Sequence, residues 1–465
     1  MLCVAPSRAQ ACGRWAHALR SAGAWKLGRR FATDGLRRVQ WRAMSTDVPD
    51  EDNHLYDEAA PTVPAYSTAE ATDEWSDLQG EAVPEGFPAR VAEFFGDIKR
   101  TTLLVRSTDM LLEEHLFSLH SQTEAGQSIQ DAGAVYLDGP GGSGKSASVL
   151  RLVCAARNSG WTVLYIPDTK KILYGSGSYV PWLGEKTGRN EDGKVWWYDR
   201  PEPTLSILKS FKEVHGNELA RMEITSDGCD TTRELLNRAD TSNVLGLVDF
   251  ALDTGENIEV HHELGPKLIG DVFDTMLNCL CGPVENPVLI AIDDWNSLVG
   301  LSDFFTPRQR RIHSRGIRLS NRFINISELS ARMQNGFVVA ANSKQVPPCF
   351  ERRSRVVGGI YKEFMVTDED KAAPSGESIL QTFFDNSRLV DTNLLPTQIT
   401  EEHRLSTTGN ITLRCSTFRR EEWLALVREY QDARFLRDQD PALLDRIFVA
   451  CSGRAHLLHH CAKAL

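Results

Sequence analysis

The sequence predicts an α/β fold: a three-layer core with a parallel sheet, followed by a mostly helical C-terminal region. Short apolar runs recur at residues 134–138, 161–166, 288–293 and 337–341. Helical patterns separate these runs, and alternating strands and helices are typical of a parallel sheet that helices cover on both faces. Beyond residue 416 the apolar spacing becomes that of amphipathic helices.

The N-terminal part of the chain is divided by charge. Residues 1–46 hold nine Lys or Arg and one acidic residue, whereas residues 47–89 hold twelve acidic residues and no Lys or Arg. The first composition is typical of a transit peptide, so we expect residues 1–44 to direct the chain to the mitochondrial matrix. A disordered basic arm, a translation start at Met44 or a plastid signal are the alternatives. We expect residues 45–90 to form an acidic disordered linker, because they contain few aliphatic side chains.

Residues 91–350 are expected to form the core. Its expected elements are strands at Ala134–Asp138, Trp161–Ile166, Val288–Asp293 and Phe337–Ala341, and helices near 144–158 and 262–280. Residues 170–260 read as loops and helices without a strong sheet signal.

Residues 351–465 are expected to form the mostly helical region. A strand is possible at Ile411–Cys415, and Gly453 should separate the last two helices. Apolar residues with helical spacing form three groups: Trp423, Leu426, Val427 and Tyr430; Leu444, Ile447, Phe448 and Cys451; and Leu458, Cys461, Ala462 and Leu465.

The stretch YLDGPGGSGKSAS, residues 136–148, contains the pattern GxxxxGK[ST]. Glycines let the backbone curl so that several N–H groups point at anionic oxygens, and the following helix adds the positive end of its dipole. The lysine neutralises the β- and γ-phosphates, and the hydroxyl after it can bind Mg²⁺. We therefore expect a P-loop NTPase core of the AAA+ or additional-strand type. The expected phosphate-binding residues are Gly139, Pro140, Gly141, Gly142, Ser143, Gly144, Lys145 and Ser146.

Two later strands end in polar residues that suit the same site. Asp293 follows VLIAI and is expected to hold Mg²⁺ together with Ser146, although an aspartate there could also merely cap a helix. Asp294 stands where many hydrolysing ATPases of this class carry a glutamate that activates water. Its side chain is one methylene shorter, so a catalytic role is possible but weakly supported. Asn342 or Ser343 is expected to face the γ-phosphate, with a turn residue as the alternative.

Four other features of the sequence bear on the function classes that remain open. No Asn-Lys-x-Asp pattern occurs, so the sequence alone leaves open whether the base is guanine or adenine. The net charge of −11 gives no support for nucleic-acid binding through bulk charge. No apolar run approaches the roughly 18 residues of a membrane span. The ten cysteines are scattered without a CxxC pair, which favours free thiols.

Arginines gather in one stretch, residues 307–323, which contains no acidic residue. The stretch could contact RNA phosphates or an acidic protein, or it could be a solvated helix face. Gly453-Arg454 could act as a sensor near the γ-phosphate or form a simple turn between helices. The arginines of the main cluster are Arg308, Arg310, Arg311, Arg315, Arg318 and Arg322, and a smaller cluster contains Arg352, Arg353 and Arg355.

Five stretches in this order resemble the death-associated protein three family, the P-loop proteins of the mitochondrial ribosomal small subunit. They are YLDGPGGSGKSASVLRLVCAARNSGWTVLYIPD, WWYDRPEPTLSILKSFKEVHGNEL, VLIAIDDWNSLVG, ITLRCSTFRREEWLALVREY and FVACSGRAHLLHHCAKAL. The resemblance covers about residues 95–465. It implies a structural subunit of the small-subunit head that binds GTP or GDP with Mg²⁺, ATP being possible. It also implies contacts with small-subunit ribosomal RNA and neighbouring ribosomal proteins. An active AAA+ or signal-transducing ATPase that acts as a switch outside the ribosome is the alternative.

Overall fold

The computed structural model describes the chain from Trp75 to Ala464 with several gaps. The expected transit peptide, residues 1–44, and most of the expected linker lie outside the described residues. Among the described helices, none is long and apolar enough to cross a membrane. The described residues are 75–78, 83–127, 129, 132–174, 179–185, 194–224, 230–256, 265–298, 300–306, 311–343, 386–392, 405, 408–437 and 440–464.

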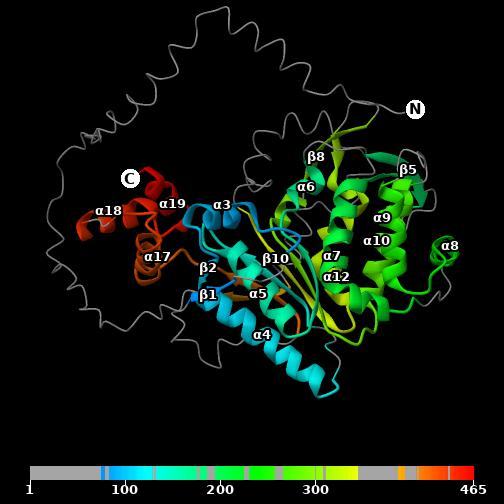
Figure 1. Ribbon diagram of the computed structural model, residues 1–465, viewed down its shortest axis with the longest axis horizontal. Coiled ribbons are helices and arrows are strands. Elements are labelled where there is room, and N and C mark those ends of the chain that lie inside the picture. Colours follow the sequence, from blue (N-terminus) through cyan, green and yellow to red (C-terminus); the bar gives the residue numbers. More distant parts are fainter. Residues whose placement is uncertain are drawn as a thin grey trace, which may run out of the picture. The chain divides into compact units, whose positions relative to one another are not determined.

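A six-stranded parallel sheet forms the centre of the fold (Figure 1). Its strand order is β11-β12-β3-β10-β7-β4. The strands span Ser387–Asp391 (β11), Asn410–Arg414 (β12), Ala134–Asp138 (β3), Gly336–Ala341 (β10), Val288–Ile292 (β7) and Thr162–Ile166 (β4). The expected α/β class and its parallel sheet are confirmed. Two strands of the region expected to be mostly helical, β11 and β12, extend this sheet.

Helices cover both faces of the sheet. In β7, Val288 and Ile290 belong to one buried apolar cluster, and Leu289 and Ala291 belong to another. This alternation follows from the two-residue period of a strand. The second cluster includes residues of α4 (Ser107–Glu124) and α5 (Lys145–Asn158). The first includes residues of α7 (Pro201–Arg221), α8 (Asp230–Ala239), α9 (Val244–Glu256), α10 (Gly265–Cys281), α11 (Arg318–Ile324) and α12 (Ile326–Arg332).

The outer edge of β4 is partly closed by a side chain of α7. His215 interrupts α7 with non-helical dihedral angles, φ −117° and ψ 24°. Its Nε2 atom accepts a hydrogen bond from the Val163 main-chain N–H at 3.0 Å. The imidazole therefore occupies a hydrogen-bonding position that a further strand would otherwise use.

Two antiparallel hairpins stand beside the main sheet. β5 (Val180–Glu185) pairs with β6 (Lys194–Asp199), and β8 (Leu301–Phe305) pairs with β9 (Arg311–His313). The expectation of no sheet within residues 170–260 is therefore wrong. The strand β5 was not predicted because it contains Pro181 and Gly184, and both residue types are depleted in strands. Short connecting elements complete this part: α6 (Lys170–Leu173), η2 (Trp295–Leu298) and η3 (Ser314–Gly316).

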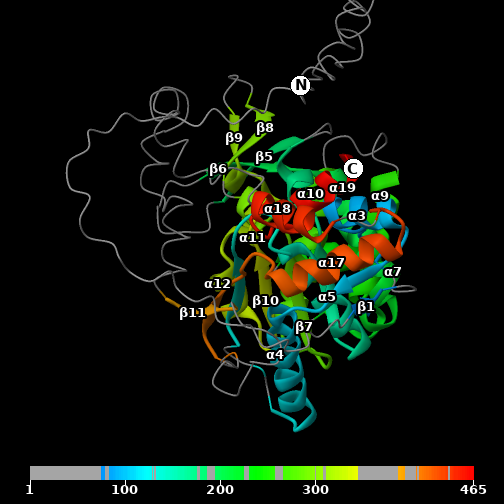
Figure 2. The same ribbon diagram turned by 90° about the vertical axis from the view of Figure 1, so that its left-hand side faces the viewer.

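Elements from the two ends of the described chain pack together. β1 (Trp75–Asp77) pairs with β2 (Thr102–Leu104), so the fold begins inside the stretch expected to be a linker. Ile98 of α3 (Ala89–Ile98) shares a buried cluster with Trp423 and Leu458. Figures 1 and 2 both show α3 beside α19. The three expected C-terminal helices are present as α17 (Arg420–Asp432), α18 (Pro441–Cys451) and α19 (Ala455–Ala464).

Candidate nucleotide site

The glycine-rich loop lies between a strand and a helix, as its motif requires. β3 ends at Asp138 and α5 begins at Lys145. Gly142 and Gly144 have φ angles of 79° and 88°, in the left-handed region that favours glycine. The turn leads directly into the first turn of α5, whose free N–H groups and dipole favour an anion.

Lys145 folds back over this loop. Its ammonium group donates to the carbonyl oxygens of Gly139 at 3.0 Å and Pro140 at 2.9 Å, and to the Ser143 hydroxyl at 3.2 Å. The side chain is buried. Its charge therefore lies on the loop itself, where phosphate oxygens would be stronger hydrogen-bond acceptors than these neutral groups.

Ser146 and Asp293, assigned to one Mg²⁺ site from separate motifs, meet beside the loop. The Ser146 hydroxyl donates to the buried Asp293 carboxylate, which also accepts the Asp294 main-chain N–H at 2.9 Å. Burial, followed by the negative charge of Asp294, raises the pKa of Asp293 well above its usual range. A cation beside this carboxylate would offset the cost of its burial. A hydroxyl and a carboxylate are also the oxygen ligands that Mg²⁺ prefers, so the pair fits that ion.

Asp294 lies at the same edge of the sheet, but another side chain holds its carboxylate. Asp294 has a φ of 54° and forms an ion pair with Lys170. Its carbonyl oxygen accepts a hydrogen bond from the Thr169 hydroxyl at 2.7 Å. The Lys170 ammonium therefore competes with water for one oxygen of this carboxylate and withdraws negative charge from it. The geometry therefore gives little support to catalysis by Asp294.

Asn342 and Ser343 follow β10 at this edge. Asn342 Nδ2 donates to the Asp138 carboxylate at 2.9 Å, and the Ser343 N–H donates to Asn296 at 2.8 Å. Asn342 Oδ1 is buried and has no hydrogen-bond partner among the described residues. Since such a group costs stability when left unpaired, a donor such as a metal-bound water would suit this position.

A cavity of about 240 Å³ opens beside the loop. Residues 141–146 line it together with Asp293, Asp294 and Asn342, so most of the predicted site residues come to one place. The other lining residues were not predicted, because they come from parts of the chain that are far apart and that no local pattern connects. They include Arg90 and Phe94 of α3, Leu104 of β2, Tyr430 of α17, and His456 and His459 of α19.

Arg106 connects the loop to the C-terminal region. Its buried guanidinium donates to the Ser143 carbonyl at 2.6 Å and to both oxygens of the buried Glu422 carboxylate at 3.1 Å. It also lies 4.2 Å from the centre of the Phe418 ring. One side chain thus joins α4, the glycine-rich loop and α17. The sequence gives no indication of this role, because no local pattern distinguishes Arg106 from any other arginine before a helix.

Two arginines of the predicted basic patch are paired within the protein. Arg322 lies 2.6 Å from Asp274, and Arg318 is only 9% exposed. The interpretation of the stretch as a patch facing solvent or RNA is wrong for Arg318, because β6 and α10 bring acidic partners. The Arg322 side chain is 33% exposed, so its pairing with Asp274 leaves part of it at the surface. Arg318 pairs with Asp199, Asp271 and Asp274.

The other arginines of the two clusters give less information. Arg311 is exposed and lies 3.5 Å from Asp303. Outside the described residues are Arg308, Arg310, Arg352, Arg353 and Arg355.

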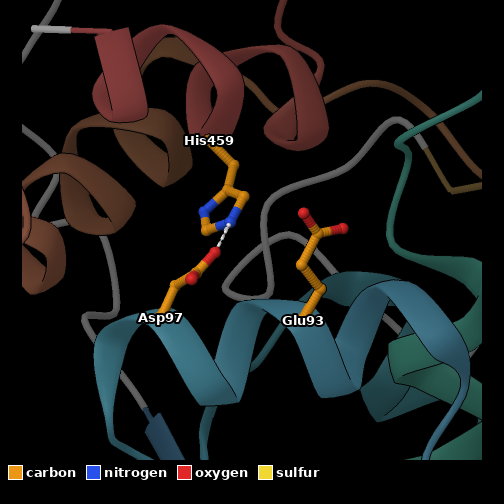
Figure 3. A group of neighbouring side chains, drawn as sticks. All are labelled: Glu93, Asp97 and His459. Carbon is orange, nitrogen blue, oxygen red and sulfur yellow. Dashed lines mark hydrogen bonds and ion pairs between the residues drawn. The ribbon is translucent and has the colours of Figure 1, made fainter. Parts of the chain in front are cut away.

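Figure 3 shows polar side chains that join α3 to α19: Glu93, Asp97 and His459. His459 Nε2 lies 2.8 Å from the Asp97 carboxylate. Lys463 lies 2.7 Å from Glu93 and 2.6 Å from Asp97, and these contacts lower the pKa of both carboxyl groups. Because the Lys463 ammonium group already pairs with both carboxylates, the group suits a link between two helices better than a metal site.

Two comparisons identify relatives. The small ribosomal subunit protein mS29 of Neurospora crassa is 23% identical to this chain over 236 residues, which cover 51% of the chain and 46% of that protein. The chain thus spans about half the length of the relative it matches. The family described as mitochondrial ribosomal death-associated protein 3 matches residues 110–363, and its description agrees with the expected location at the mitochondrial ribosome. Since the match covers more than half of the chain and includes Lys145, Asp293 and Asn342, this protein belongs to the mitochondrial ribosomal death-associated protein 3 family.

Proposed function

We propose that the protein is a structural component of the small subunit of the mitochondrial ribosome and holds a purine nucleotide with Mg²⁺ there. Membership of the family and the name of the Neurospora relative support the ribosomal role. As in the prediction from the sequence, the partners are small-subunit ribosomal RNA and neighbouring ribosomal proteins.

One observation carries the nucleotide part of the proposal. Ser146 and the buried Asp293 are joined by a hydrogen bond beside a loop that already holds the Lys145 ammonium. Loop N–H groups and Lys145 would hold the phosphates, and Ser146 with Asp293 would hold the Mg²⁺. The ion would neutralise phosphate charge. The resemblance to the family favours GTP or GDP, with ATP as the alternative.

A structural use of the nucleotide needs no catalytic base. A ligand at about 100 times its dissociation constant stabilises a fold by roughly 2.7 kcal/mol. The ion pair between Asp294 and Lys170 supports retention of the nucleotide over its hydrolysis.

The nucleotide proposal is tested by calorimetric titration of the full-length chain with GDP, GTP, ADP and ATP, with and without Mg²⁺. We expect binding of one purine pair, dependence on Mg²⁺, and loss of binding in Lys145→Ala. Lys171→Ala is the matched control, because Lys171 is an exposed lysine that does not line the cavity. Absence of binding of all four nucleotides to the unmodified chain contradicts the proposal.

The structural role is tested by sucrose-gradient sedimentation of mitochondrial extracts. We expect the protein in the small-subunit fractions, and less of Lys145→Ala than of Lys171→Ala in those fractions. A Lys145→Ala protein that has lost the nucleotide but still assembles and supports translation would show that the nucleotide is not structural.

The alternative function, an active ATPase outside the ribosome, rests on one observation: Asp294 lines the cavity. It requires phosphate release by the purified chain that disappears in Asp294→Asn and sedimentation apart from ribosomal subunits.

A further inference from the structure

Lys170, the first residue of α6, lines the same cavity as Lys145 and Ser146. Its ammonium group pairs with Asp294 and makes no other hydrogen bond to a described residue. An ammonium group has three N–H donors, so two of them remain for a ligand. The Lys170 side chain is 30% exposed, so a ligand in the cavity can reach this group.

The main chain at Lys170 is fixed beside the end of β7. The buried Thr169 hydroxyl donates to the Asp294 carbonyl at 2.7 Å, and the Lys170 N–H donates to the Asp168 carboxylate at 3.0 Å. Since a lysine side chain is long and flexible, its ammonium group can turn toward a ligand while the main chain stays in place. The positive charge is therefore held at the side of the cavity where Asp294 lies.

Two carboxylates at this side of the cavity create a need for a positive charge. Asp293 accepts the Asp294 N–H, and the charge of Asp294 contributes to the raised pKa of Asp293, so the two carboxylates lie close together. A phosphate that shares a Mg²⁺ ion with Ser146 and Asp293 would come beside both. Each further phosphate adds negative charge there, and like charges repel. Lys170 is the cation that lies in position to offset this repulsion.

We propose that the Lys170 ammonium bridges the Asp294 carboxylate and the terminal phosphate of a bound nucleoside triphosphate, so that the site prefers the triphosphate and keeps it intact. This inference rests on the proposed nucleotide binding. Loop N–H groups would hold the phosphates that di- and triphosphates share, whereas Lys170 meets the group by which they differ. The bridge also keeps one oxygen of Asp294 paired, which disfavours activation of water by this carboxylate.

The test compares the unmodified full-length chain with Lys170→Met in calorimetric titrations with Mg²⁺. The probes are GDP and guanylyl imidodiphosphate, a triphosphate analogue that resists hydrolysis, and in parallel the two adenine counterparts. Lys171→Met is the matched control, because Lys171 is the next residue, is exposed and does not line the cavity. We expect Lys170→Met to weaken binding of the analogue about 10-fold or more, which is the effect of losing a hydrogen bond between charged groups. Binding of the diphosphate should change little, which also shows that the variant is folded.

A second variant removes the whole ion pair. Lys170→Met/Asp294→Asn leaves no unpaired carboxylate, so it serves as the test if the single variant does not fold. Because the carboxylate that repels the terminal phosphate is gone as well, we expect this variant to favour the analogue over the diphosphate more than Lys170→Met does. It should still favour the analogue less than the unmodified chain does.

The outcomes separate this inference from the proposed function. If the unmodified chain binds no nucleotide, the proposed function itself fails. If it binds nucleotide and the ratio of the two affinities is the same in both variants as in the unmodified chain, only the role of Lys170 is wrong. Equal losses for diphosphate and analogue overturn the inference in favour of a general effect of charge or packing. Tighter binding of the analogue by Lys170→Met also overturns it, because Lys170 would then obstruct the terminal phosphate.

Discussion

Arg106 and Arg420 each pair with a carboxylate, but their surroundings differ. The Arg106 and Glu422 side chains are 4% and 8% exposed, whereas those of Arg420 and Asp445 are 58% and 50% exposed. Buried charges depend on their partners for the solvation that they lost, and exposed charges keep most of theirs. The buried pair should therefore matter far more for stability.

Arg106→Leu is expected to destabilise the fold by about 3–5 kcal/mol, because it leaves Glu422 buried without its partner. Arg420→Leu, the matched change at the exposed pair, should cost less than about 1 kcal/mol. Urea unfolding followed by circular dichroism measures both. The double variant Arg106→Leu/Glu422→Leu should recover part of the loss. Equal midpoints for Arg106→Leu and Arg420→Leu would contradict this account.

At the scale of residues, the sequence predicted one half of the candidate site. Lys145, Ser146 and Asp293 follow from local motifs whose spacing reflects the chemistry of phosphate and Mg²⁺, and the structure brings them together. Arg106 and His456 could not be found in this way. Their places beside the loop depend on contacts with residues that are distant in sequence, Glu422 and Gly142.

The turn between α18 and α19 is the element that places the start of α19 at the loop. Ser452 and Gly453 have φ angles of 51° and 63°, both in the left-handed region. A side chain at Gly453 would also overlap the Phe418 carbonyl. The Gly453 carbonyl accepts the Phe418 N–H at 2.7 Å, which fixes the turn against the chain before α17.

Replacing Ser452 by glycine and Gly453 by alanine should change the free energy of unfolding in opposite directions. Ser452→Gly should raise the free energy of unfolding by up to about 1 kcal/mol, because glycine adopts this conformation without strain. Gly453→Ala should lower it by about 1–3 kcal/mol, because both the backbone and the Phe418 carbonyl oppose a side chain. Thermal unfolding of the two variants checks the signs, and stabilisation by both would show that the turn is not constrained as described.

At the scale of elements, apolar strands were easy to predict and the hairpins were not. β3, β4, β7 and β10 lie within one residue of their expected bounds, because buried parallel strands are nearly continuous apolar runs. β5 lacks such a run. The aromatic residues of β6, Trp196 to Tyr198, were the feature of the sequence that could have indicated this hairpin.

At the scale of the whole molecule, His115 and His215 are buried histidines whose neutral state should make the protein sensitive to acid. His115 packs edge-on against Phe337, and neither of its ring nitrogens has a partner among the described residues. Burial lowers the pKa of His115 and of His215 to about 4, compared with about 6.5 in an unfolded chain. Between these values only the unfolded chain takes up the protons, so stability must fall as the pH decreases.

We therefore expect the free energy of unfolding to decrease between about pH 6.5 and pH 4, by on the order of 3 kcal/mol for His115 alone. Urea unfolding at pH 7 and pH 4.5 measures the decrease. His115→Leu should lose less stability over this range than the unmodified chain, and His120→Ala should lose the same amount. An unchanged decrease in His115→Leu would exclude His115 as a cause.

The imidazole of His215 has a further consequence beyond stability. Below about pH 4 the imidazole carries a second N–H, so it can no longer accept the hydrogen bond from the Val163 main-chain N–H. Strand β4, at one edge of the sheet, would then expose an unpaired N–H to other molecules, which is the first step of intermolecular strand pairing. We therefore expect the chain to self-associate below about pH 4, where this hydrogen bond is lost.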